Sequence, residues 1–238
     1  MRLHRFYVPT PIVADTFDIT DRDMVHQWKK VFRYNVGSQV ILFDGSGTDY
    51  LCMISSIRNL GATVGVISKK TQPSLEATAG KKNIWLCMAL IKKDNFDLVV
   101  QKATELGVNH IVPIICEHSE KRKLNLDRMG KIAIEAAEQS GRGDILDIHE
   151  SMPLAEVLES GILSQEKIAL HPSGISFRQY KQTLEQASVA VFVGPEGGFS
   201  DKEIALFKQY NMPIVSLGTQ ILRAETAAVA ISSLMLLG

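Results

Sequence analysis

From residue 83 onward, apolar runs of strand length alternate with segments of helical period, and this alternation constrains the fold more than any other feature. Residues 83–90, NIWLCMAL, have the pattern of a strand that is buried on both faces. Residues 94–107 follow as a helix, with Asp94 placed to cap it and Gly107 placed to end it. Strands that alternate with helices predict an α/β fold with a largely parallel sheet.

The alternation continues to the end of the printed sequence. Ser200 and Glu203 have the spacing of a capping box, which marks the start of one of the later helices. Further strands are expected at 110–116, 144–148, 167–171, 189–193 and 213–217, and further helices at 124–141, 153–161, 177–187, 200–210 and 224–238.

Residues 1–71 have a different pattern and are expected to form a separate β-rich domain. Thr20 and Asp23 sit at capping-box spacing before a short helix. The segment 72–82 is small and polar and predicts a linker, so the second domain is expected at 83–238. Strands at 4–8, 39–44, 48–57 and 62–68, with a hairpin turn around Gly45–Gly47, make a small barrel or curled sheet the simplest arrangement of the first domain.

The total charge of the chain gives no indication of a nucleic-acid partner, because Lys+Arg and Asp+Glu are both 26. A basic surface that binds nucleic acid must therefore be local. The first 70 residues contain nine Lys/Arg against six Asp, a net charge of +3. Such runs of charge are more often a solvated face than a ligand site, and both interpretations stay open.

The spacing of the cysteines and the hydropathy of the chain indicate which cellular compartment to expect. Cys52, Cys87 and Cys116 are far apart, and no CxxC pair or Cys/His cluster has the spacing of a zinc site. We therefore expect reduced core thiols, no metal and a cytoplasmic protein. No apolar stretch approaches the roughly 20 residues that a membrane span requires, so no membrane partner is expected.

Two glycine-containing loops follow consecutive predicted strands. VGPEGGFSDKEI, residues 193–204, ends the strand at 189–193, and LGTQILRAETA, residues 217–227, ends the strand at 213–217. A third strand end carries LHPSG, residues 170–174. In open α/β sheets, ligands bind outside the carboxyl ends of the strands. These loops are therefore the candidate ligand site, although turn formation alone is an alternative reason for their glycines.

The loops lack the known signatures of phosphate and nucleophile sites. No GxxxxGK[ST], GxGxxG or GxSxG is present, and Pro195 removes one amide donor. Ser200 is better explained as a helix cap than as a nucleophile. Glycines still allow a ligand to approach the main chain closely. A ligand without a polyphosphate, such as S-adenosylmethionine, fits such a loop.

The two loops resemble the signature loops of the SPOUT methyltransferases, and more narrowly of the bacterial RsmE-type enzymes. QKATELGV at 101–108, EAAEQSGR at 135–142, LHP at 170–172 and the opening RFYV are also similar to that family, so the resemblance covers nearly the whole chain. It implies an N-terminal PUA-like β-barrel that grips RNA and a C-terminal α/β domain with a deep trefoil knot. It further implies a homodimer that methylates ring nitrogen 3 of a uridine in 16S ribosomal RNA of the small ribosomal subunit, with S-adenosylmethionine as cofactor.

The resemblance assigns the cofactor site residue by residue. The positions that match the family motifs are Leu170, His171, Pro172, Gly194, Pro195, Glu196, Gly197, Gly198, Leu217, Gly218, Ile221, Leu222, Arg223 and Ala227. The second loop departs from the usual LGPRILRTETA at Thr219, Gln220 and Ala224. The loss of that arginine puts its role on RNA in doubt and leaves a different RNA target possible.

Removal of the proton from a uracil nitrogen requires a base or a group that stabilises the anion. Glu196 and Glu138 are candidate bases, and Arg223 or Arg142 would stabilise negative charge on the uracil oxygens. Orientation in the pocket is a further source of rate. The residues expected to grip RNA are Arg2, His4, Arg5, Lys29, Lys30, Arg33, Lys92, Lys93, Lys121, Arg122, Lys123 and Arg142.

Two alternatives come from other functional classes. One is a non-catalytic RNA-binding factor of ribosome assembly, which the intact cofactor loops disfavour. The other is an unrelated nucleotide-dependent α/β enzyme, which the missing phosphate signatures disfavour.

Overall fold

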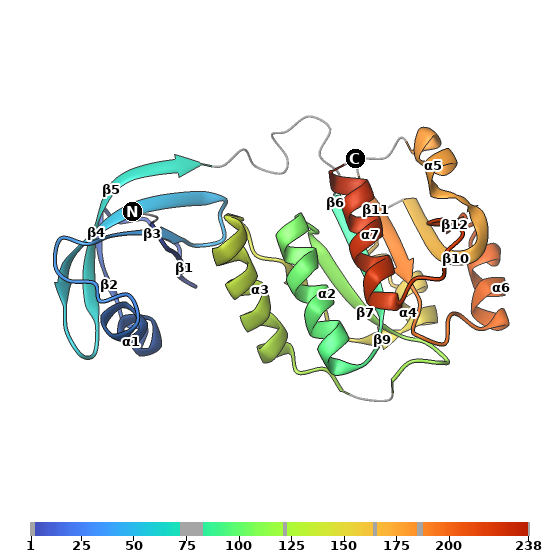
Figure 1. The fold of residues 1–238 in the computed structure, drawn as a ribbon, viewed down its shortest axis with the longest axis horizontal. Helices are drawn as coiled ribbons and strands as arrows, with labels where there is room; N and C mark the ends of the chain where they lie inside the picture. The colour runs from blue at the N-terminus through green and yellow to red at the C-terminus, as the bar shows by residue number, and fades with distance from the viewer. Residues whose placement is uncertain (1–2, 72–82, 121–122, 164–165, 185–187, 238) are drawn as a thin grey trace. The chain divides into compact units, whose positions relative to one another are not determined.

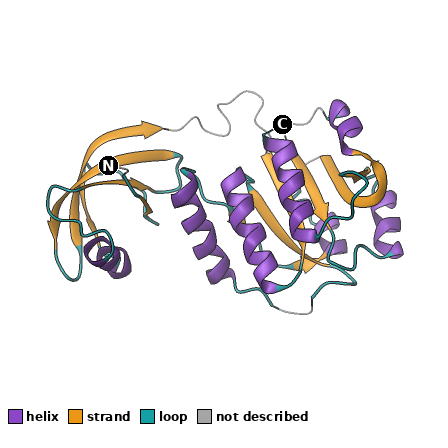
Figure 2. Cartoon of the chain, viewed as in Figure 1, coloured by secondary structure: helices purple, strands orange, loops and turns teal. Residues whose placement is uncertain are grey.

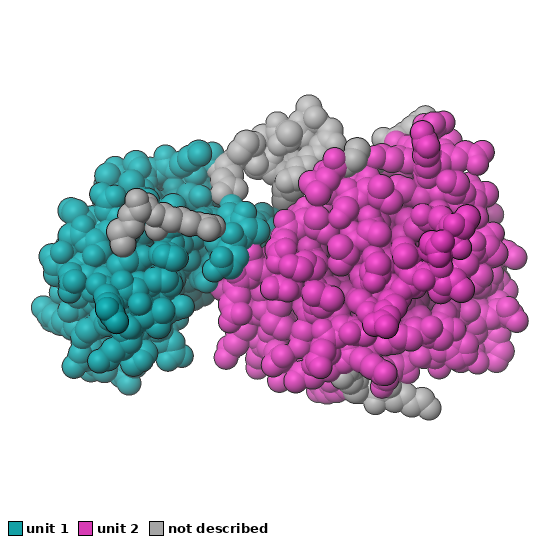
Figure 3. Space-filling view, in the orientation of Figure 1, with its two compact units in different colours: residues 1–77, 137–145 teal, residues 78–136, 146–238 magenta. Residues whose placement is uncertain are grey.

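The computed structural model describes residues 3–71, 83–120, 123–163, 166–184 and 188–237. The chain divides into two compact units, residues 1–77 with 137–145 and residues 78–136 with 146–238 (Figure 3). The expected linker at 72–82 and the RNA-binding candidates Arg2, Lys121 and Arg122 lie outside the described residues.

The first unit is a five-stranded sheet with one helix (Figure 1). The sheet has the order β1-β3-β4-β5-β2, and β3, β4 and β5 pair antiparallel, as the hairpin turn predicts. Strand β2 was not predicted from the sequence. The elements are β1 (Arg5–Tyr7), β2 (Thr16–Ile19), α1 (Arg22–Lys30), β3 (Gln39–Phe43), β4 (Thr48–Ile57) and β5 (Ala62–Thr71).

Helix α1 closes the core of this sheet through two fully buried side chains, Val25 and Trp28. Phe6 of β1 packs edge-on against the Trp28 ring at a centroid distance of 5.4 Å. The expected cap was wrong by one residue, because Asp21, not Thr20, accepts hydrogen bonds from the amides of Asp23 and Met24. Asp is as good an N-cap as Thr, so spacing alone did not distinguish them.

The segment 137–145 belongs to the first unit although it follows residues 78–136 of the second unit in sequence. The amide of Gly47, in the β3–β4 turn, donates to the carbonyl of Gly143 at 3.1 Å. A Cβ on Gly143 would lie 3.1 Å from the Cα of Gly47. The two main chains approach so closely that a larger residue at 143 would push them apart.

The second unit is a parallel sheet of order β12-β10-β11-β6-β7-β8, with β9 paired to β7. Every pairing among the described residues of this sheet is parallel, which confirms the predicted fold class. Strand order does not describe threading, so the trefoil knot stays a prediction. The strands are β6 (Asn83–Ala89), β7 (His110–Ile115), β8 (Asp147–Ile148), β9 (Met152–Pro153), β10 (Glu166–Ser176), β11 (Ser188–Val193) and β12 (Ile214–Ser216).

Helices cover both faces of this sheet (Figure 2). Alternate residues of β6 enter two different cores: Leu86 and Met88 pack with α2 and α7, whereas Cys87 and Ala89 pack with α4 and α6. No helix in the described ranges has the length and apolar character that a membrane crossing requires. The helices are α2 (Lys93–Leu106), α3 (Leu126–Ser140), α4 (Leu154–Glu159), α5 (Phe177–Tyr180), η1 (Lys181–Thr183), α6 (Asp201–Gln209) and α7 (Ala224–Leu236).

Of the two predicted ends of α2, one is confirmed and the other is wrong. Gly107 ends α2 in the left-handed conformation, with φ 94°, as predicted. Asp94 does not cap this helix, because α2 begins one residue earlier and Lys92 takes the N-cap position without a side-chain hydrogen bond. Asp94 lies instead in the first turn, where its charge favours the helix dipole.

Candidate functional site

A cavity of about 300 Å³ lies at the carboxyl ends of β11 and β12 and beside the middle of β10. The strand end expected at residue 171 is wrong, because β10 continues to Ser176 after an irregularity in its pairing with β12 between Leu170 and Ile175. The three strands are neighbours in the sheet and run parallel, so these segments meet on one side of it. The walls are formed by Leu170, His171, Pro172, Val193, Gly194, Pro195, Glu196, Gly198, Phe199, Val215, Ser216, Leu217, Gly218, Gln220, Ile221, Leu222, Arg223, Ala224 and Ala227. Most are apolar side chains or main chain, and few carry charge.

The structure brings nearly all of the expected cofactor residues to this one cavity. The exception is Gly197, which faces His118: a Cβ at 197 would lie 3.0 Å from the Cβ of His118. The sequence prediction missed wall residues such as Val193, Val215 and Phe199. The two valines are strand ends that carry no motif, so only the sheet register marks them.

The first loop is fixed by its turn and by the helix that follows it. The amide of Gly198 donates to the carbonyl of Pro195 at 2.9 Å, and Gly198 has φ +72°, a conformation that glycine adopts without strain. The predicted capping box of α6 is present, since Ser200 and Glu203 exchange both hydrogen bonds. Glu203 also accepts from the amide of Glu117 at 2.9 Å, which ties the start of α6 to the end of β7.

The second loop forms the opposite wall and ends at the N-terminus of α7. Gly218 has φ +145°, and its amide and carbonyl both bond to the Ser216 hydroxyl, at 3.3 and 2.9 Å. Ile221 is 88% exposed, although it lines the cavity. Residues 219 and 220, at which the sequence departs from the resembled motif, lie on this loop, and Gln220 lines the cavity.

Two groups of opposite charge stand on the cavity wall. The Glu196 carboxylate accepts from the amide of Lys92 at 3.4 Å and is otherwise exposed. Arg223 is the N-cap residue of α7, is exposed, and forms no salt bridge within the described part of the chain. Glu225, in the first helical turn, is 7% exposed, and its Oε2 has no hydrogen-bond partner among the described residues.

Glu138 is not among the residues that line the cavity. Its carboxylate accepts from the backbone amide of Tyr7 at 2.9 Å, within the first unit. This bond joins Glu138 to the last residue of β1. Of the two candidate bases, Glu196 lines the cavity and Glu138 does not, and the catalytic role of either stays a prediction.

Arg5 and Arg142 are buried rather than presented to a ligand, with side chains 9% and 7% exposed. Arg5 forms a salt bridge to Asp49, and Arg142 forms one to Asp144 at 2.7 Å. Arg5 also donates to the carbonyls of Ala137 and Arg142, at 2.9 and 3.1 Å. Both guanidinium groups therefore have structural contacts at the segment 137–145, and their expected contact with RNA stays a prediction.

The other described basic candidates are at the surface. Lys29 is partly buried and bonds to Asn59 at 2.7 Å, and the His4 ring packs on Phe32 with a centroid distance of 4.3 Å. Arg33 adopts φ 56°, one of two positive-φ non-glycine residues. The exposed side chains are His4, Lys30 and Arg33 in the first unit and Lys92, Lys93 and Lys123 in the second.

Family models match both units. A model described as an RNA methyltransferase domain matches residues 78–236, and one described as an RNA methyltransferase PUA domain matches residues 29–67. The chain is 31% identical to the ribosomal RNA small subunit methyltransferase E of Rickettsia conorii, over 100% of this chain and 97% of that protein. It is 29% identical to the protein of the same name from Bacillus subtilis, over 90% and 87%.

A solved structure extends the similarity to three dimensions. The crystal structure of a ribosomal RNA small subunit methyltransferase E from Neisseria gonorrhoeae bound to S-adenosyl methionine superposes with a TM-score of 0.85 at 26% identity. The match covers 98% of this chain and 97% of that chain. The similarity therefore includes both units and the cavity at the strand ends.

Proposed function

Because the chain belongs to the ribosomal RNA small subunit methyltransferase E family, we propose that it transfers the methyl group of S-adenosylmethionine to ring nitrogen 3 of a uridine in 16S ribosomal RNA. The observation that carries this proposal is the cavity beside β10 and at the ends of β11 and β12, which gathers both signature loops. Ribosomal RNA places the reaction in the cytoplasm. We infer a homodimer from the family resemblance alone.

The cavity suits this cofactor better than a nucleotide with a phosphate chain. Its walls are apolar or main chain, and the loop between Gly194 and Ser200 contains no lysine or arginine to balance a polyphosphate. Gly194, Gly198 and Gly218 allow a ligand to approach the main chain. Glu196, the one acidic side chain on the wall, suits a cationic ligand.

When bound, S-adenosylmethionine supplies an electrophilic methyl group on a cationic sulfur. The reaction forms the bond from N3 to the methyl carbon and breaks the bond from sulfur to that carbon, while the N3 proton leaves. We propose that Glu196 accepts this proton and that Arg223 stabilises negative charge on the uracil oxygens, because both side chains line the cavity. Orientation of the reactants by the two loops would supply further rate.

RNA would be held through its phosphates by exposed basic side chains. We propose the exposed His4, Lys30 and Arg33 and the half-buried Lys29 of the first unit for this role. Residues 1–71 stay our proposed RNA-binding domain, to which the contacts add 137–145, and 83–238 stay the proposed methyltransferase domain. Lys92, whose amide contacts Glu196, brings a positive charge beside the cavity. Phosphate contacts of this kind weaken as salt rises.

Two measurements test the proposal. Calorimetry should show one S-adenosylmethionine site per chain and no binding of ATP or NAD. Mass spectrometry of ribosomal RNA nucleosides should find 3-methyluridine in cells with the gene and a loss of it in cells without. Binding without any change in RNA methylation would favour the assembly-factor alternative, and a different lost modification would assign the altered loop at 219–224 to another RNA target.

A further inference from the structure

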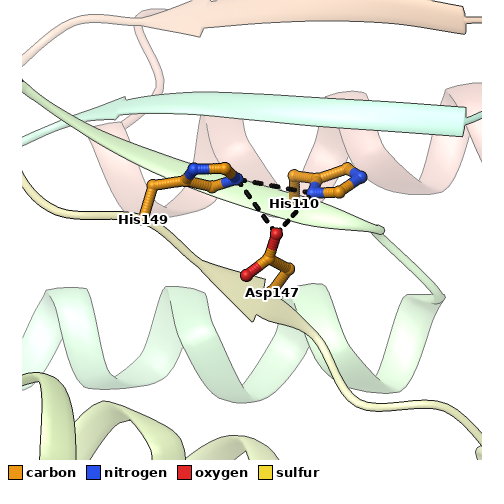
Figure 4. A group of neighbouring side chains, drawn as sticks. All are labelled: His110, Asp147 and His149. Atoms are coloured by element: carbon orange, nitrogen blue, oxygen red, sulfur yellow. Dashed lines mark hydrogen bonds and ion pairs between the residues drawn. The ribbon is translucent and has the colours of Figure 1, made fainter. Parts of the chain in front are cut away.

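Three side chains that bind metals converge at the opposite edge of the parallel sheet from the cavity. They are His110, Asp147 and His149, whose ligand atoms all lie within 4.8 Å of one another (Figure 4). His110 is the first residue of β7, at the amino end of a strand, whereas the cavity is at the carboxyl ends. The cluster is therefore separate from the site proposed for methyl transfer.

The sheet register explains why these residues meet. His110 pairs directly with Asp147 across the parallel β7–β8 pair. His149 lies two residues after Asp147, on the same face of an extended segment, and its amide donates to the Ile111 carbonyl at 2.9 Å. On the other side, Trp85 of β6 pairs with His110. Three positions on three neighbouring strands, with His149 directly after β8, thus form one local group.

The three ligand atoms have the mutual spacing of a tetrahedral site. His110 Nδ1 and His149 Nε2 lie 3.0 and 3.1 Å from Asp147 Oδ2, and the two nitrogens are 3.4 Å apart. Ligands bound at about 2.0–2.1 Å with tetrahedral angles are separated by about 3.3 Å. A single ion at the centre of the triangle would therefore reach all three atoms with little movement.

Two kinds of interaction fit this triangle. Each imidazole nitrogen offers either one hydrogen or one lone pair, and the carboxylate only accepts. Two ring N–H groups that donate to Asp147 form a hydrogen-bonded cluster in which the edge between His110 and His149 carries no hydrogen bond. A cation receives a lone pair from each atom at once, because metal binding uses neutral imidazoles and an ionised carboxylate.

The surroundings hold the ligands in place and leave access from solvent. The Trp85 ring stacks on His110 with a centroid distance of 3.7 Å and an interplanar angle of 15°, which fixes the orientation of that imidazole. The side chains of His110, His149 and Asp147 are 23%, 25% and 57% exposed. A water molecule can therefore complete a fourth coordination position.

We propose that His110, Asp147 and His149 bind one divalent transition-metal ion, of which Zn²⁺ fits best. Two imidazoles and one carboxylate are a ligand set that Zn²⁺ accepts, with a fourth position left open. The ion would fasten the two-residue strand β8 at the edge of the sheet to β7. This role is structural and does not depend on methyl transfer.

Titration of the untagged full chain with ZnCl₂, in competition with a chromogenic chelator, tests the site. We expect one equivalent bound per chain, and binding at least about tenfold weaker in Asp147→Asn and in His149→Gln. His26→Gln, on the exposed face of α1, is the matched control and should bind as the unaltered chain does. Equal Zn²⁺ affinity in all four proteins would overturn the proposal.

Two further measurements distinguish the loss of the metal site from the misfolding of a variant. The S-adenosylmethionine affinity of each variant reports whether its fold is intact, because the cavity does not include the cluster. Substitution of Co²⁺ into the unaltered chain should give the strong visible absorption of four-coordinate Co²⁺. A spectrum of only hydrated Co²⁺ would show a hydrogen-bonded cluster without a metal, whatever the variants do.

Discussion

The Arg5 guanidinium lies 2.6 Å from the Asp49 carboxylate, with both side chains largely withdrawn from solvent. The same guanidinium lies 4.4 Å from the centre of the Phe43 ring and donates to two carbonyls of the segment 137–145. A residue that the sequence marked for RNA therefore organises the first unit.

Arg5→Ala should lower the free energy of unfolding of the first unit by about 3 kcal/mol, because it removes a largely buried salt bridge to Asp49 and two hydrogen bonds to the carbonyls of Ala137 and Arg142. Urea unfolding followed by Trp28 fluorescence, in a Trp85→Phe background, measures this unit. Lys30→Ala is the control, because it removes an exposed positive charge of the same unit. It should change the free energy of unfolding by less than about 0.5 kcal/mol. Equal effects of the two substitutions would contradict the structural role of Arg5.

Arg33→Gly should separate RNA binding from stability. Arg33 follows α1 in the left-handed conformation, at the position where glycine is the usual residue, and the amide of Tyr34 donates to the carbonyl of Trp28 at 2.8 Å. Glycine removes a backbone cost of about 1 kcal/mol, so we expect stability to be retained or raised. RNA affinity should fall, with a salt dependence that is smaller by about one phosphate contact.

Filter binding over a range of salt concentrations gives the RNA result, and urea unfolding gives the stability. Unchanged RNA affinity would remove Arg33 from the RNA-binding face. A large loss of stability would mean that its side chain packs against the unit instead.

Glu196→Gln and Glu138→Gln distinguish the two candidate bases. Both substitutions keep an oxygen that accepts the observed backbone hydrogen bond and remove only the charge. We expect Glu196→Gln to lower kcat by about 10²-fold and also to weaken S-adenosylmethionine binding, because the substitution removes the negative charge that faces the cationic ligand. Glu138→Gln should leave kcat unchanged. Single-turnover methyl transfer to small ribosomal subunits measures both, and full activity of Glu196→Gln would assign the rate to orientation alone.

The three cysteines should resist alkylation in the native state. Cys52, Cys87 and Cys116 are buried. Burial raises the pKa of the Cys52 thiol to about 11 and raises the pKa values of the other two further still. Because the thiolate is the reactive form, reaction with Ellman's reagent at pH 8 should be slow and should become complete in denaturant. Rapid reaction of one thiol in the native protein would contradict its burial.

The sequence predicted the second unit well because its strands are continuous apolar runs that tolerate few other structures. Local sequence signals mark several of its elements. An apolar run marks the strand at 83–90, Gly107 marks the end of α2, and Ser200 marks the end of the first loop. The ligand loops were found for the same reason, since glycine and proline are strong markers of turns.

Long-range pairings were missed because nothing local encodes them. Glu138 looks like an ordinary helix residue until the amide of Tyr7 lies beside it. Arg5 looks like a free cation until Asp49 is placed 44 positions away. The meeting of His110 with Asp147 depends on the register of two parallel strands, and cysteine-based metal spacing gives no indication of it.

The attachment of residues 137–145 to the first unit has a consequence for anyone who divides this protein. A fragment that stops at residue 71 would leave the Arg5 cation without the Ala137 and Arg142 carbonyls, and the Tyr7 amide without the Glu138 oxygen. The first unit is therefore made of two stretches that are far apart in the sequence, and a fragment that represents this unit must include both.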